Sequence, residues 1–424
     1  MAEFIIEGDA RLHGEVTSSG NKNAALPLLA ASLLTDQPIT LHNVPTIRDV
    51  ETMIQLLQTL GVKAEWIGPS SLRLHAKEVH TCTLDATLCK EIRASILLAG
   101  PLLSREGGVS LPPPGGDVIG RRRVDTHFLA LKALGADVRV DGRFALSARQ
   151  LIGADVMLDE ASVTATENAI MAAARAKGDT VIRNAASEPH VQDLCNCLTQ
   201  MGARIDGIGS NTLTIHGQDC LNGTEFEIGA DNIEVTSFIV LSALRGDGVW
   251  IRKASPEHLG MTGLILQRLG ICFETHGQDV YVPGGQSLQV ELELDGAIPM
   301  IADNPWPAFP ADAMSLAVVA ATQVNGTVLI HEKMFESRLY FVDKLIGMGA
   351  RIVLCDPHRC IVQGPSHLHG ELVQSPDIRA GVALVIAALC AHGQSTISNV
   401  QQIERGYERF DEKLRSLGAV IQRV

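Results

Sequence analysis

Three cations stand where apolar, helix-forming runs begin. Lys22 opens the run in SSGNKNAALPLLAASLL, Arg93 opens IRASILLAG, and Arg379 opens IRAGVALVI. A cation beside the free backbone N–H groups at a helix start makes a binding site for an anion. Lys22 and its neighbour Asn23 could also simply begin and solvate a helix, and a lone arginine could keep its charged end in water. Because the arginines recur at equivalent places, we favour a shared anion-binding cleft.

A second candidate is the stretch SLPPPGGDVIGRRRVDTHF, residues 110–128. Three prolines followed by two glycines predict a stiffened loop with a tight turn. This loop would deliver Asp117 and then Arg121, Arg122 and Arg123 within a short span. A solvated charged loop is one interpretation. The stretch stands where other parts of the chain have a plain strand, so we expect a functional loop that replaces this strand.

A repeated element must position these residues. Six helix-like stretches end in Leu-Gly or Met-Gly, and consecutive glycines lie 67 to 79 residues apart, at Gly61, Gly135, Gly202, Gly270, Gly349 and Gly418. Glycine adopts the left-handed conformation that ends a helix at little energetic cost, so each glycine is predicted to terminate a helix. The 424 residues therefore divide into six units of one size.

Each repeat opens with an apolar run rich in small residues, such as DAMSLAVVAATQVNG, followed by a β-branched segment such as TVLIHEK. A helix without a polar face must be covered on every side, which places the helices inside and the sheets outside. A single core rarely grows beyond about 250 to 300 residues. We therefore predict an α/β protein of two domains, each with three repeats, that divide near residue 230.

The composition is that of an ordinary folded protein, with 46% hydrophobic and 20% charged residues. A net charge of −13 argues against a nucleic-acid partner, whereas a small anion needs only a few converging cations. The longest apolar stretch, residues 380–391, is shorter than the roughly 18 residues that predict a membrane span. The opening MAEFIIEGDA has no signal-peptide pattern, so we expect a cytoplasmic protein.

The nine cysteines form no regular framework, which favours reduced thiols. Two groups could be taken for halves of a zinc site, namely Cys195 with Cys197, and Cys355 with His358 and Cys360. Each group lacks a matching second pair, so we expect no metal site.

Nine short motifs resemble the UDP-N-acetylglucosamine enolpyruvyltransferase family. In chain order they are SGNKNAALP, RASILLAGPLL, LPPPGGDVIGRRRVD, ASVTATEN, NAASEP, AFPAD, FESR, DIRA and ERGYERFDEKL. Their order and spacing carry the resemblance, which runs from residue 3 to residue 423. The related shikimate-pathway enzymes share the architecture, but GGDVIGRRRVD and ERGYERFDEKL resemble the UDP-sugar branch.

The resemblance implies a two-domain inside-out α/β barrel of six repeated βαβαββ-type units, three per domain, with the helices buried. Residues 22–231 would form the N-terminal lobe, which carries the catalytic loop 111–120. Residues 1–21 together with 232–424 would form the C-terminal lobe, joined to the first by a double crossover.

The implied reaction transfers the enolpyruvyl group of phosphoenolpyruvate to the 3-hydroxyl of UDP-N-acetylglucosamine and releases phosphate, the first committed step of peptidoglycan synthesis. By resemblance, Asp312 is the base, and Lys22 and Arg405 also take part in catalysis. Phosphoenolpyruvate would be bound by Lys22, Asn23, Arg122, Arg338, Arg379 and Arg405. Because arginines neutralise the charge, we expect no cofactor and no metal. We further expect a monomer whose partners are these two small substrates.

Asp117 stands at the loop tip, where most family members have a cysteine that acts as the acid or aids product release. Nearby arginines should lower the pKa of this carboxyl, but loop closure over a dianionic substrate could raise it again. We interpret Asp117 as the general acid. A carboxylate is a far poorer nucleophile than a thiolate, so we predict insensitivity to fosfomycin, the antibiotic that alkylates the loop thiolate of this family.

By resemblance the UDP-sugar would contact Arg93, Arg122, Arg123, Val124, Asp125, Thr126, Ser162, Val163, Thr164, Asp312 and Met334. Three positions depart from the family pattern, because Arg123 replaces a proline, Glu160 stands where lysine is frequent, and Thr164 replaces a glycine. Two alternatives therefore stay open. One is an enolpyruvyltransferase of secondary metabolism that acts on another nucleotide or UDP-sugar. The other is a non-catalytic regulator that binds UDP-sugars, although such a protein would have no need of the base.

Overall fold

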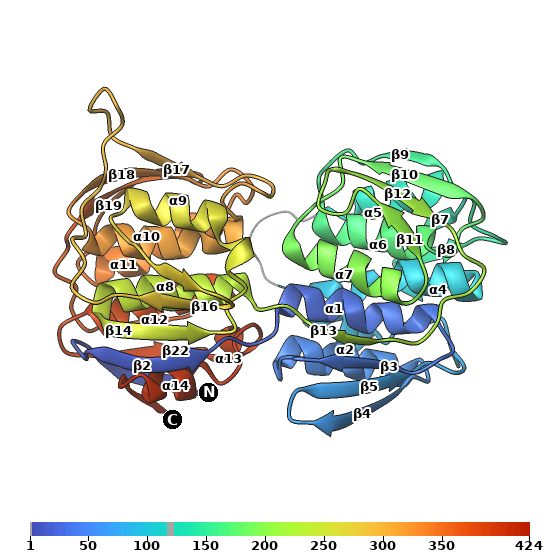
Figure 1. Cartoon of the computed structure of the whole chain (residues 1–424), viewed down its shortest axis with the longest axis horizontal. Coiled ribbons are helices and arrows are strands. Elements are labelled where there is room, and N and C mark those ends of the chain that lie inside the picture. The colour runs from blue at the N-terminus through green and yellow to red at the C-terminus, as the bar shows by residue number, and fades with distance from the viewer. Residues whose placement is uncertain (1, 117–122) are drawn as a thin grey trace. The chain divides into compact units, whose positions relative to one another are not determined.

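The structure, a computed structural model, describes residues 2–116 and 123–424 (Figure 1). These residues fall into two compact units. The N-terminal unit comprises residues 20–116 and 123–229, and the C-terminal unit comprises residues 2–19 and 230–424. Two of the predicted site residues, Asp117 and Arg122, lie outside the described residues.

The N-terminal unit contains three sheets around its helices. Its strands are β3 (Ile39–His42), β4 (Lys63–Gly68), β5 (Ser71–His75), β6 (Gly108–Leu111), β7 (Asp137–Val140), β8 (Phe144–Ser147), β9 (Asp155–Met157), β10 (Asp179–Arg183), β11 (Arg204–Asp206), β12 (Thr212–His216) and β13 (Glu225–Glu227). Its α-helices are α1 (Lys22–Ala31), α2 (Arg48–Thr59), α3 (Ala86–Glu91), α4 (Ala99–Glu106), α5 (Asp125–Ala133), α6 (Val163–Ala173) and α7 (Pro189–Gln200). The strand orders are β13-β3-β5-β4, β11-β12-β10-β9 and β6-β8-β7.

The C-terminal unit repeats this plan. Its strands are β1 (Glu3–Glu7), β2 (Leu12–Thr17), β14 (Gly246–Arg252), β15 (Glu274–His276), β16 (Asp279–Val282), β17 (Met300–Ala302), β18 (Gly326–His331), β19 (Arg351–Asp356), β20 (Arg359–Gly364), β21 (Leu372–Gln374), β22 (Gln394–Ser398) and β23 (Val420–Arg423). Its α-helices are α8 (Asn232–Arg245), α9 (Gly260–Arg268), α10 (Met314–Gln323), α11 (Val342–Gly347), α12 (Ile378–Cys390), α13 (Gln401–Glu404) and α14 (Phe410–Ser416). The strand orders are β21-β22-β1-β23, β15-β16-β14-β2 and β17-β18-β20-β19.

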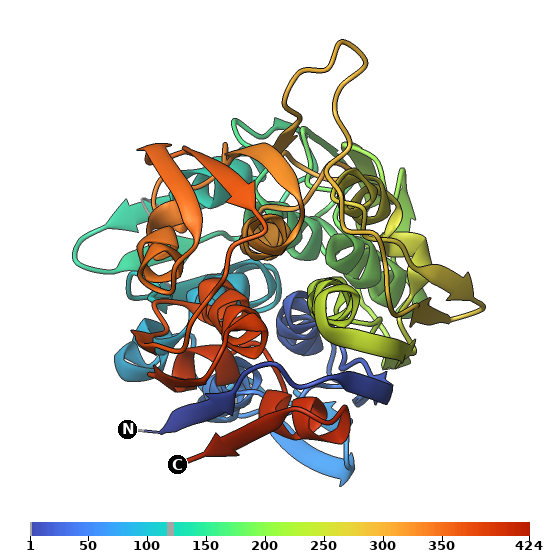
Figure 2. The ribbon, with the colours of Figure 1, turned by 90° about the vertical axis from the view of Figure 1, so that its left-hand side faces the viewer.

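The apolar helices lie inside each unit, as the sequence predicted. In the C-terminal unit, α8, α10 and α12 are buried over most of their length, and strands enclose them when they are viewed end-on (Figure 2). In the N-terminal unit, α1 and α6 are buried in the same way. The expected inside-out α/β architecture is therefore confirmed. No helix in the described part of the chain is long and apolar enough to cross a membrane.

The six repeated glycines end helices as predicted. Their φ angles lie between 71° for Gly270 and 102° for Gly61, which is the left-handed region that L side chains rarely adopt. At Gly61 a side chain would also meet the ring of His80, because an added Cβ would lie 2.8 Å from it. Each glycine thus turns the chain from an amphipathic helix into the next strand.

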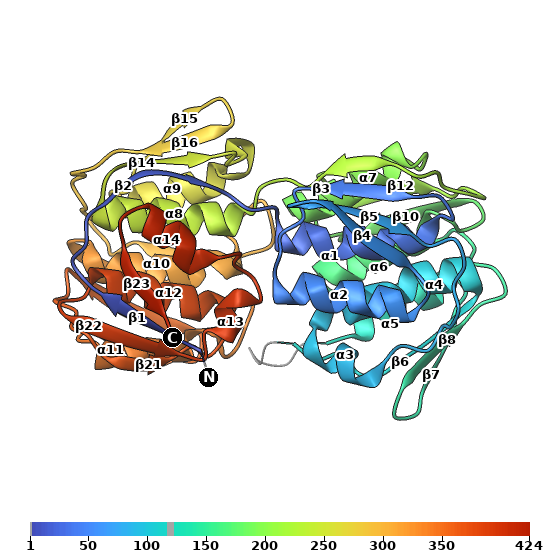
Figure 3. The ribbon, with the colours of Figure 1, turned by 90° about the horizontal axis from the view of Figure 1, so that it is seen from below.

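Both ends of the chain contribute to one sheet of the C-terminal unit. β1 pairs antiparallel with β22 on one side and with β23 on the other, and Figure 3 shows it between them. β2 pairs in parallel with β14 in a second sheet. Residues 2–19 are therefore an integral part of the C-terminal unit, although they precede the N-terminal unit in the sequence.

The proline-rich loop follows a strand instead of replacing it. β6 pairs antiparallel with β8 from Gly108 to Leu111, so the expected replacement is wrong. Pairing stops at Pro112 because three successive prolines have no N–H group to donate. Within the described residues, this sheet has no parallel strand. An isolated parallel bridge between Thr83 and Ser110 lies where such a strand would pair.

Candidate functional site

An acid held between two buried arginines is the central feature of the C-terminal unit. Asp312 lies in a 3₁₀ turn, Ala311–Ala313, that leads into α10. Its Oδ1 accepts a hydrogen bond from Nη2 of Arg338 at 2.9 Å, and its Oδ2 accepts two from Arg379, from Nε at 3.1 Å and from Nη2 at 3.0 Å. Arg338 and Arg379 are only 5% and 6% exposed. One carboxylate therefore offsets two buried positive charges.

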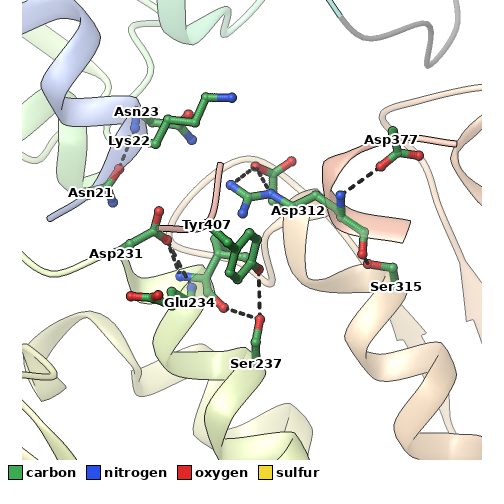
Figure 4. A network of polar contacts seen from close by, with 12 residues as sticks. Asn21, Lys22, Asn23, Asp231, Glu234, Ser237, Asp312, Ser315, Asp377 and Tyr407 are labelled. Atoms are coloured by element: carbon green, nitrogen blue, oxygen red, sulfur yellow. Dashed lines mark hydrogen bonds and ion pairs between the residues drawn. The ribbon is translucent and has the colours of Figure 1, made fainter. Parts of the chain in front are cut away.

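Arg379 is placed by the start of α12. The Asp377 carboxylate caps this helix and accepts the backbone N–H of Arg379 at 2.9 Å, and Ser315 donates to the Arg379 carbonyl at 3.1 Å (Figure 4). Burial by itself would lower the pKa of Arg379, but Asp312, Tyr407 and Asp231 together outweigh this effect, so the pKa is raised and the guanidinium stays charged. Its Nη1 is buried and has no hydrogen-bond partner among the described residues. A charged donor of this kind is suited to an anionic ligand.

Tyr407 also contacts the guanidinium group of Arg379. The guanidinium carbon lies 5.5 Å from the centre of the Tyr407 ring, within the range of a cation–π contact. The Tyr407 hydroxyl lies 2.8 Å from the Ser237 hydroxyl on α8 (Figure 4). Burial raises the pKa of Tyr407 to about 12, so the phenol stays neutral. Tyr407 belongs to the motif ERGYERFDEKL, but the sequence did not indicate that it contacts Arg379.

Two more predicted residues lie in the C-terminal unit. Arg405 stands directly after α13, two residues before Tyr407, and its Nη1 donates to the Gln402 side chain at 3.1 Å. Met334 follows β18, where its backbone N–H donates to Asp303 at 3.2 Å and its side chain is 41% exposed. The exposed position leaves the Met334 side chain accessible to a ligand.

Lys22 is buried at the first position of α1 in the N-terminal unit. Its Nζ lies 2.7 Å from the Asp49 carboxylate on α2, and Lys22 is 8% exposed. The Asn21 side chain caps the helix by accepting the backbone N–H of Asn23 at 2.8 Å (Figure 4). Burial does not fit the alternative in which Lys22 merely solvates a helix start. The sequence did not indicate Asp49 as its partner.

The residues predicted around the nucleotide form a polar cluster at the start of α5. Arg93 donates to the backbone carbonyl of Arg123 at 2.7 Å, and Arg123 in turn forms an ion pair of 2.8 Å with Asp159. Thr126 donates to the other Asp159 oxygen at 2.7 Å. The Thr126 hydroxyl and then Arg123 lower the pKa of Asp159, which therefore remains ionised. Asp125 begins α5 and lies 3.3 Å from Arg123. Arg123, one of the departures from the family pattern, is thus already paired within this cluster.

Arg93 does not begin an α-helix, contrary to the sequence prediction. It opens a 3₁₀ segment, Arg93–Leu98, and the α-helix α4 starts only at Ala99. At the junction of the two segments, the N–H of Gly100 donates to the side chain of Asn168 on α6 at 2.8 Å.

A buried histidine links α5 to the start of α6. The side-chain amide of Asn168 donates to Nδ1 of His127 at 2.8 Å, so Nε2 of His127 carries the hydrogen and donates to the Thr164 hydroxyl at 3.1 Å. Burial, followed by the charge of Arg93, lowers the pKa of His127 to about 3. The imidazole is therefore neutral. Thr164, a second departure from the family pattern, is thereby fixed beside Ser162 and Val163 at the N-terminus of α6.

The beginning of the predicted loop is held close to the segment before Arg93. The N–H of Gly115 donates to the Cys89 carbonyl at 3.0 Å. A Cβ on Gly115 would lie 1.7 Å from the Lys90 carbonyl oxygen, and one on Gly116 would lie 2.8 Å from the Arg93 Cβ. Both glycines are needed because the backbone passes so near. Asp117 itself lies outside the described residues.

The cysteines that could have suggested zinc are not arranged as ligands. Burial raises the pKa values of Cys195, Cys197 and Cys360 to about 12, so these thiols stay protonated. Within the part of the chain that the structure describes, no three histidine, cysteine, aspartate or glutamate side chains are grouped to hold a metal ion.

Comparison with known proteins identifies relatives over the full chain. The family model described as EPSP synthase (3-phosphoshikimate 1-carboxyvinyltransferase) matches residues 6–414. Proteins named UDP-N-acetylglucosamine 1-carboxyvinyltransferase are similar to this chain: that of Bradyrhizobium diazoefficiens is 56% identical, over 100% of this chain and 98% of its own length. That of Treponema denticola is 55% identical, over 100% of this chain and 99% of its own length.

Two solved structures share the fold. The enolpyruvyl transferase NikO from Streptomyces tendae has a TM-score of 0.89 at 24% identity and covers 100% of this chain and 99% of its own. EPSP synthase from Acinetobacter baumannii has a TM-score of 0.76 at 17% identity and covers 100% of both chains.

Proposed function

Because this chain belongs to the enolpyruvyltransferase family, in the branch of the UDP-N-acetylglucosamine 1-carboxyvinyltransferases, we propose that it transfers the enolpyruvyl group of phosphoenolpyruvate to the 3-hydroxyl of UDP-N-acetylglucosamine. The family that the nine motifs indicated is thereby confirmed, and with it the assignment to the transferases. The product would enter peptidoglycan synthesis at its first committed step.

The observation that carries the proposal is the contact of Asp312 with Arg338 and Arg379. A carboxylate that accepts a proton from the sugar hydroxyl must lie beside the cations that bind the reacting anion. The reason is that the new bond forms between the hydroxyl oxygen and this anion. The buried Nη1 of Arg379, which has no hydrogen-bond partner among the described residues, adds a donor that could bind such an anion. The proton acceptor Asp312 and the cations Arg338 and Arg379 therefore lie within hydrogen-bond distance of each other.

The substrate itself would activate the base. In the free protein the two arginines stabilise the ionised form of Asp312, which makes its carboxylate a weak base. A phosphate and a carboxylate that bind Arg338 and Arg379 would compete for the same N–H groups and draw them away from Asp312. Asp312 would then accept the proton only when phosphoenolpyruvate is present, which prevents unproductive chemistry.

The reaction proceeds by addition and then elimination. The sugar oxygen attacks C2 of phosphoenolpyruvate while its proton passes to Asp312, and C3 gains a proton from an acid, for which we propose Asp117. In the second step C3 loses a proton, the bond from C2 to the phosphate oxygen breaks, and the double bond is restored. Lys22 and Arg405 would stabilise the negative charge on the departing phosphate.

The nucleotide would bind at the N-termini of α5 and α6, through Val124 to Thr126 and Ser162 to Thr164. Free backbone N–H groups at a helix start favour phosphate oxygens. The pairing of Arg123 with Asp159 supports a structural role for Arg123 at the rim of this site. Glu160, the third departure, is exposed and its side chain can turn to the solvent.

The test is the release of phosphate by the purified protein in the presence of phosphoenolpyruvate and UDP-N-acetylglucosamine, with mass spectrometry of the nucleotide product. A product heavier by one enolpyruvyl group supports the proposal. Binding of the UDP-sugar without turnover would favour the non-catalytic regulator. If neither is seen, the acceptor is a different nucleotide, and a panel of nucleotide sugars would be assayed in the same way.

A further inference from the structure

Two buried acids, Asp303 and Glu332, precede Arg338 in the chain and have no role in the proposed reaction. Asp303 directly follows β17, and Glu332 directly follows β18. The two strands pair in parallel, with Ala302 opposite His331, so the next residue of each strand carries one of the two acids. Both acids are 0% exposed. Two carboxyl groups that are buried at one end of a sheet need hydrogen bonds or opposite charges to offset the free-energy cost of removing them from water.

The two acids hold the segment that leads to Arg338. The Asp303 carboxylate accepts the backbone N–H groups of Lys333 and Met334, the second at 3.2 Å. Oε1 of Glu332 accepts the backbone N–H of Phe335 at 3.1 Å. The Arg338 guanidinium lies over the Phe335 ring, with its carbon 4.9 Å from the ring centre. The position of Arg338 therefore depends on both acids through this segment.

Glu332 also faces Arg338 directly. Its Oε2 lies 3.9 Å from Nε of Arg338, and this Nε has no hydrogen-bond partner among the described residues. At this distance the two groups are close enough for a strong charge interaction, but they do not form a hydrogen bond.

The charges around Arg338 indicate a neutral Glu332. If Glu332 were ionised, Arg338 would face two carboxylates, Glu332 and Asp312, and would have little charge left for a substrate. Asp303 and Glu332 follow paired positions of β17 and β18 and are both out of water, and two neighbouring carboxyl groups in such surroundings do not both ionise. Burial, and then the hydrogen bond to Asp303, raise the pKa of Glu332 to about 9, against the lowering effect of Arg338. His358 contacts only the backbone carbonyl of Glu332, at 2.8 Å.

We infer that Asp303 and Glu332 share one proton and act as a positioning pair that leaves the charge of Arg338 available to Asp312 and to the incoming anion. Asp303 accepts two backbone N–H groups, so the shared proton lies on Glu332. Neither residue touches the substrate. The inference rests on the proposed function for the identity of the anion, but not for the charge arrangement.

The test compares the parent protein with Glu332→Gln, because glutamine has the shape of a protonated glutamate and cannot ionise. The KM for phosphoenolpyruvate is measured between pH 7.5 and 10 at saturating UDP-N-acetylglucosamine. In the parent, loss of the shared proton places a new negative charge beside Arg338, so KM should rise about tenfold above pH 9. In Glu332→Gln it should stay within about twofold of its value at pH 7.5. Glu293→Gln, a change of the same type on an exposed residue, should follow the parent.

Three outcomes would overturn the inference. One is a KM of the parent that does not change with pH. This measurement does not depend on whether the variant folds. Another is a rise of KM in Glu332→Gln that parallels the parent. The third is a loss of more than about 100-fold in kcat/KM at pH 7.5 in a folded Glu332→Gln, since a neutral side chain would then be insufficient.

The parent assay at pH 7.5 separates this inference from the proposed function. If the parent shows no turnover, the binding of inorganic phosphate is measured by titration calorimetry over the same pH range. The Kd for phosphate should rise above pH 9 in the parent and not in Glu332→Gln. An unchanged Kd in the parent would refute the charge arrangement whatever the acceptor substrate is.

Discussion

Asp312 accepts both the Nε and the Nη2 hydrogen bonds of Arg379 on a single oxygen, although the two residues are 67 positions apart. The other oxygen is occupied by Arg338. The predicted base and two of the predicted anion-binding cations therefore form one charge cluster. A change in any of the three must alter the other two.

Replacing Asp312 with asparagine removes the proton acceptor but preserves the shape of the side chain. We expect kcat to fall by about 10² to 10⁴, the usual contribution of a general base. The binding of phosphoenolpyruvate should persist, because two arginines lose their competing carboxylate. The measurement is phosphate release, with Asp343→Asn on the exposed side of α11 as the matched control. Retention of more than about a tenth of kcat would exclude Asp312 as the base.

Arg379→Lys keeps the positive charge but loses the planar arrangement of donors. Lysine has no counterparts of the Nε and Nη2 groups that donate together to Asp312, and it cannot present the buried Nη1 donor. We expect KM for phosphoenolpyruvate to rise by about 100-fold, which corresponds to roughly 2.7 kcal/mol. Arg359→Lys, on an exposed pair with Asp356, is the matched control and should retain the parent KM. An unchanged KM in Arg379→Lys would remove Arg379 from the anion site.

The prediction of fosfomycin insensitivity rests on Asp117, which lies outside the described residues. Incubation with fosfomycin should leave turnover intact and add no mass to the parent protein, because a carboxylate is a poor nucleophile toward an epoxide. Asp117→Cys should become sensitive and gain one adduct per chain by mass spectrometry. A stoichiometric adduct on the parent would contradict the prediction. Asp117→Asn should lose most turnover if Asp117 is the acid.

The buried imidazole of His127 predicts a loss of stability in acid. Its pKa is about 3 in the folded protein and near 6.5 when unfolded, so between these values the unfolded chain binds one proton more. Stability from this residue is thus complete above pH 6.5 and falls as the pH decreases, by roughly 1.4 kcal/mol per pH unit. Urea unfolding at pH 6.5 and pH 5 measures the difference.

His127→Gln should reduce this difference by about 2 kcal/mol, because glutamine does not titrate. The matched control is His13→Gln, at an exposed histidine, which should behave as the parent. Equal dependence on pH in all three proteins would show that His127 is accessible to protons in the folded state.

Much of the fold was predictable because the signals are local. Gly61 and its five equivalents end helices through their own backbone freedom, which depends on no distant residue. The apolar runs of α10 and α12 must be buried wherever they lie. The helix type at Arg93 was predicted less well, because this segment is held by a distant residue, Asn168 on α6, which accepts the Gly100 N–H.

The site was predictable only as a set of residue types. Lys22, Asp312, Arg338 and Arg379 were indicated by motif and resemblance, but their partners were not. Asp49 lies on another helix from Lys22, and Asn168 is 41 positions from His127.

The sequence by itself therefore determined the six repeats, the buried helices and the family, because hydrophobic periodicity and glycine positions act over a few residues. Only the tertiary structure decided that Arg338 faces both Asp312 and Glu332. Charge interactions depend on distance in space and on the exclusion of water. Both conditions arise only when segments distant in the sequence are brought together by the fold.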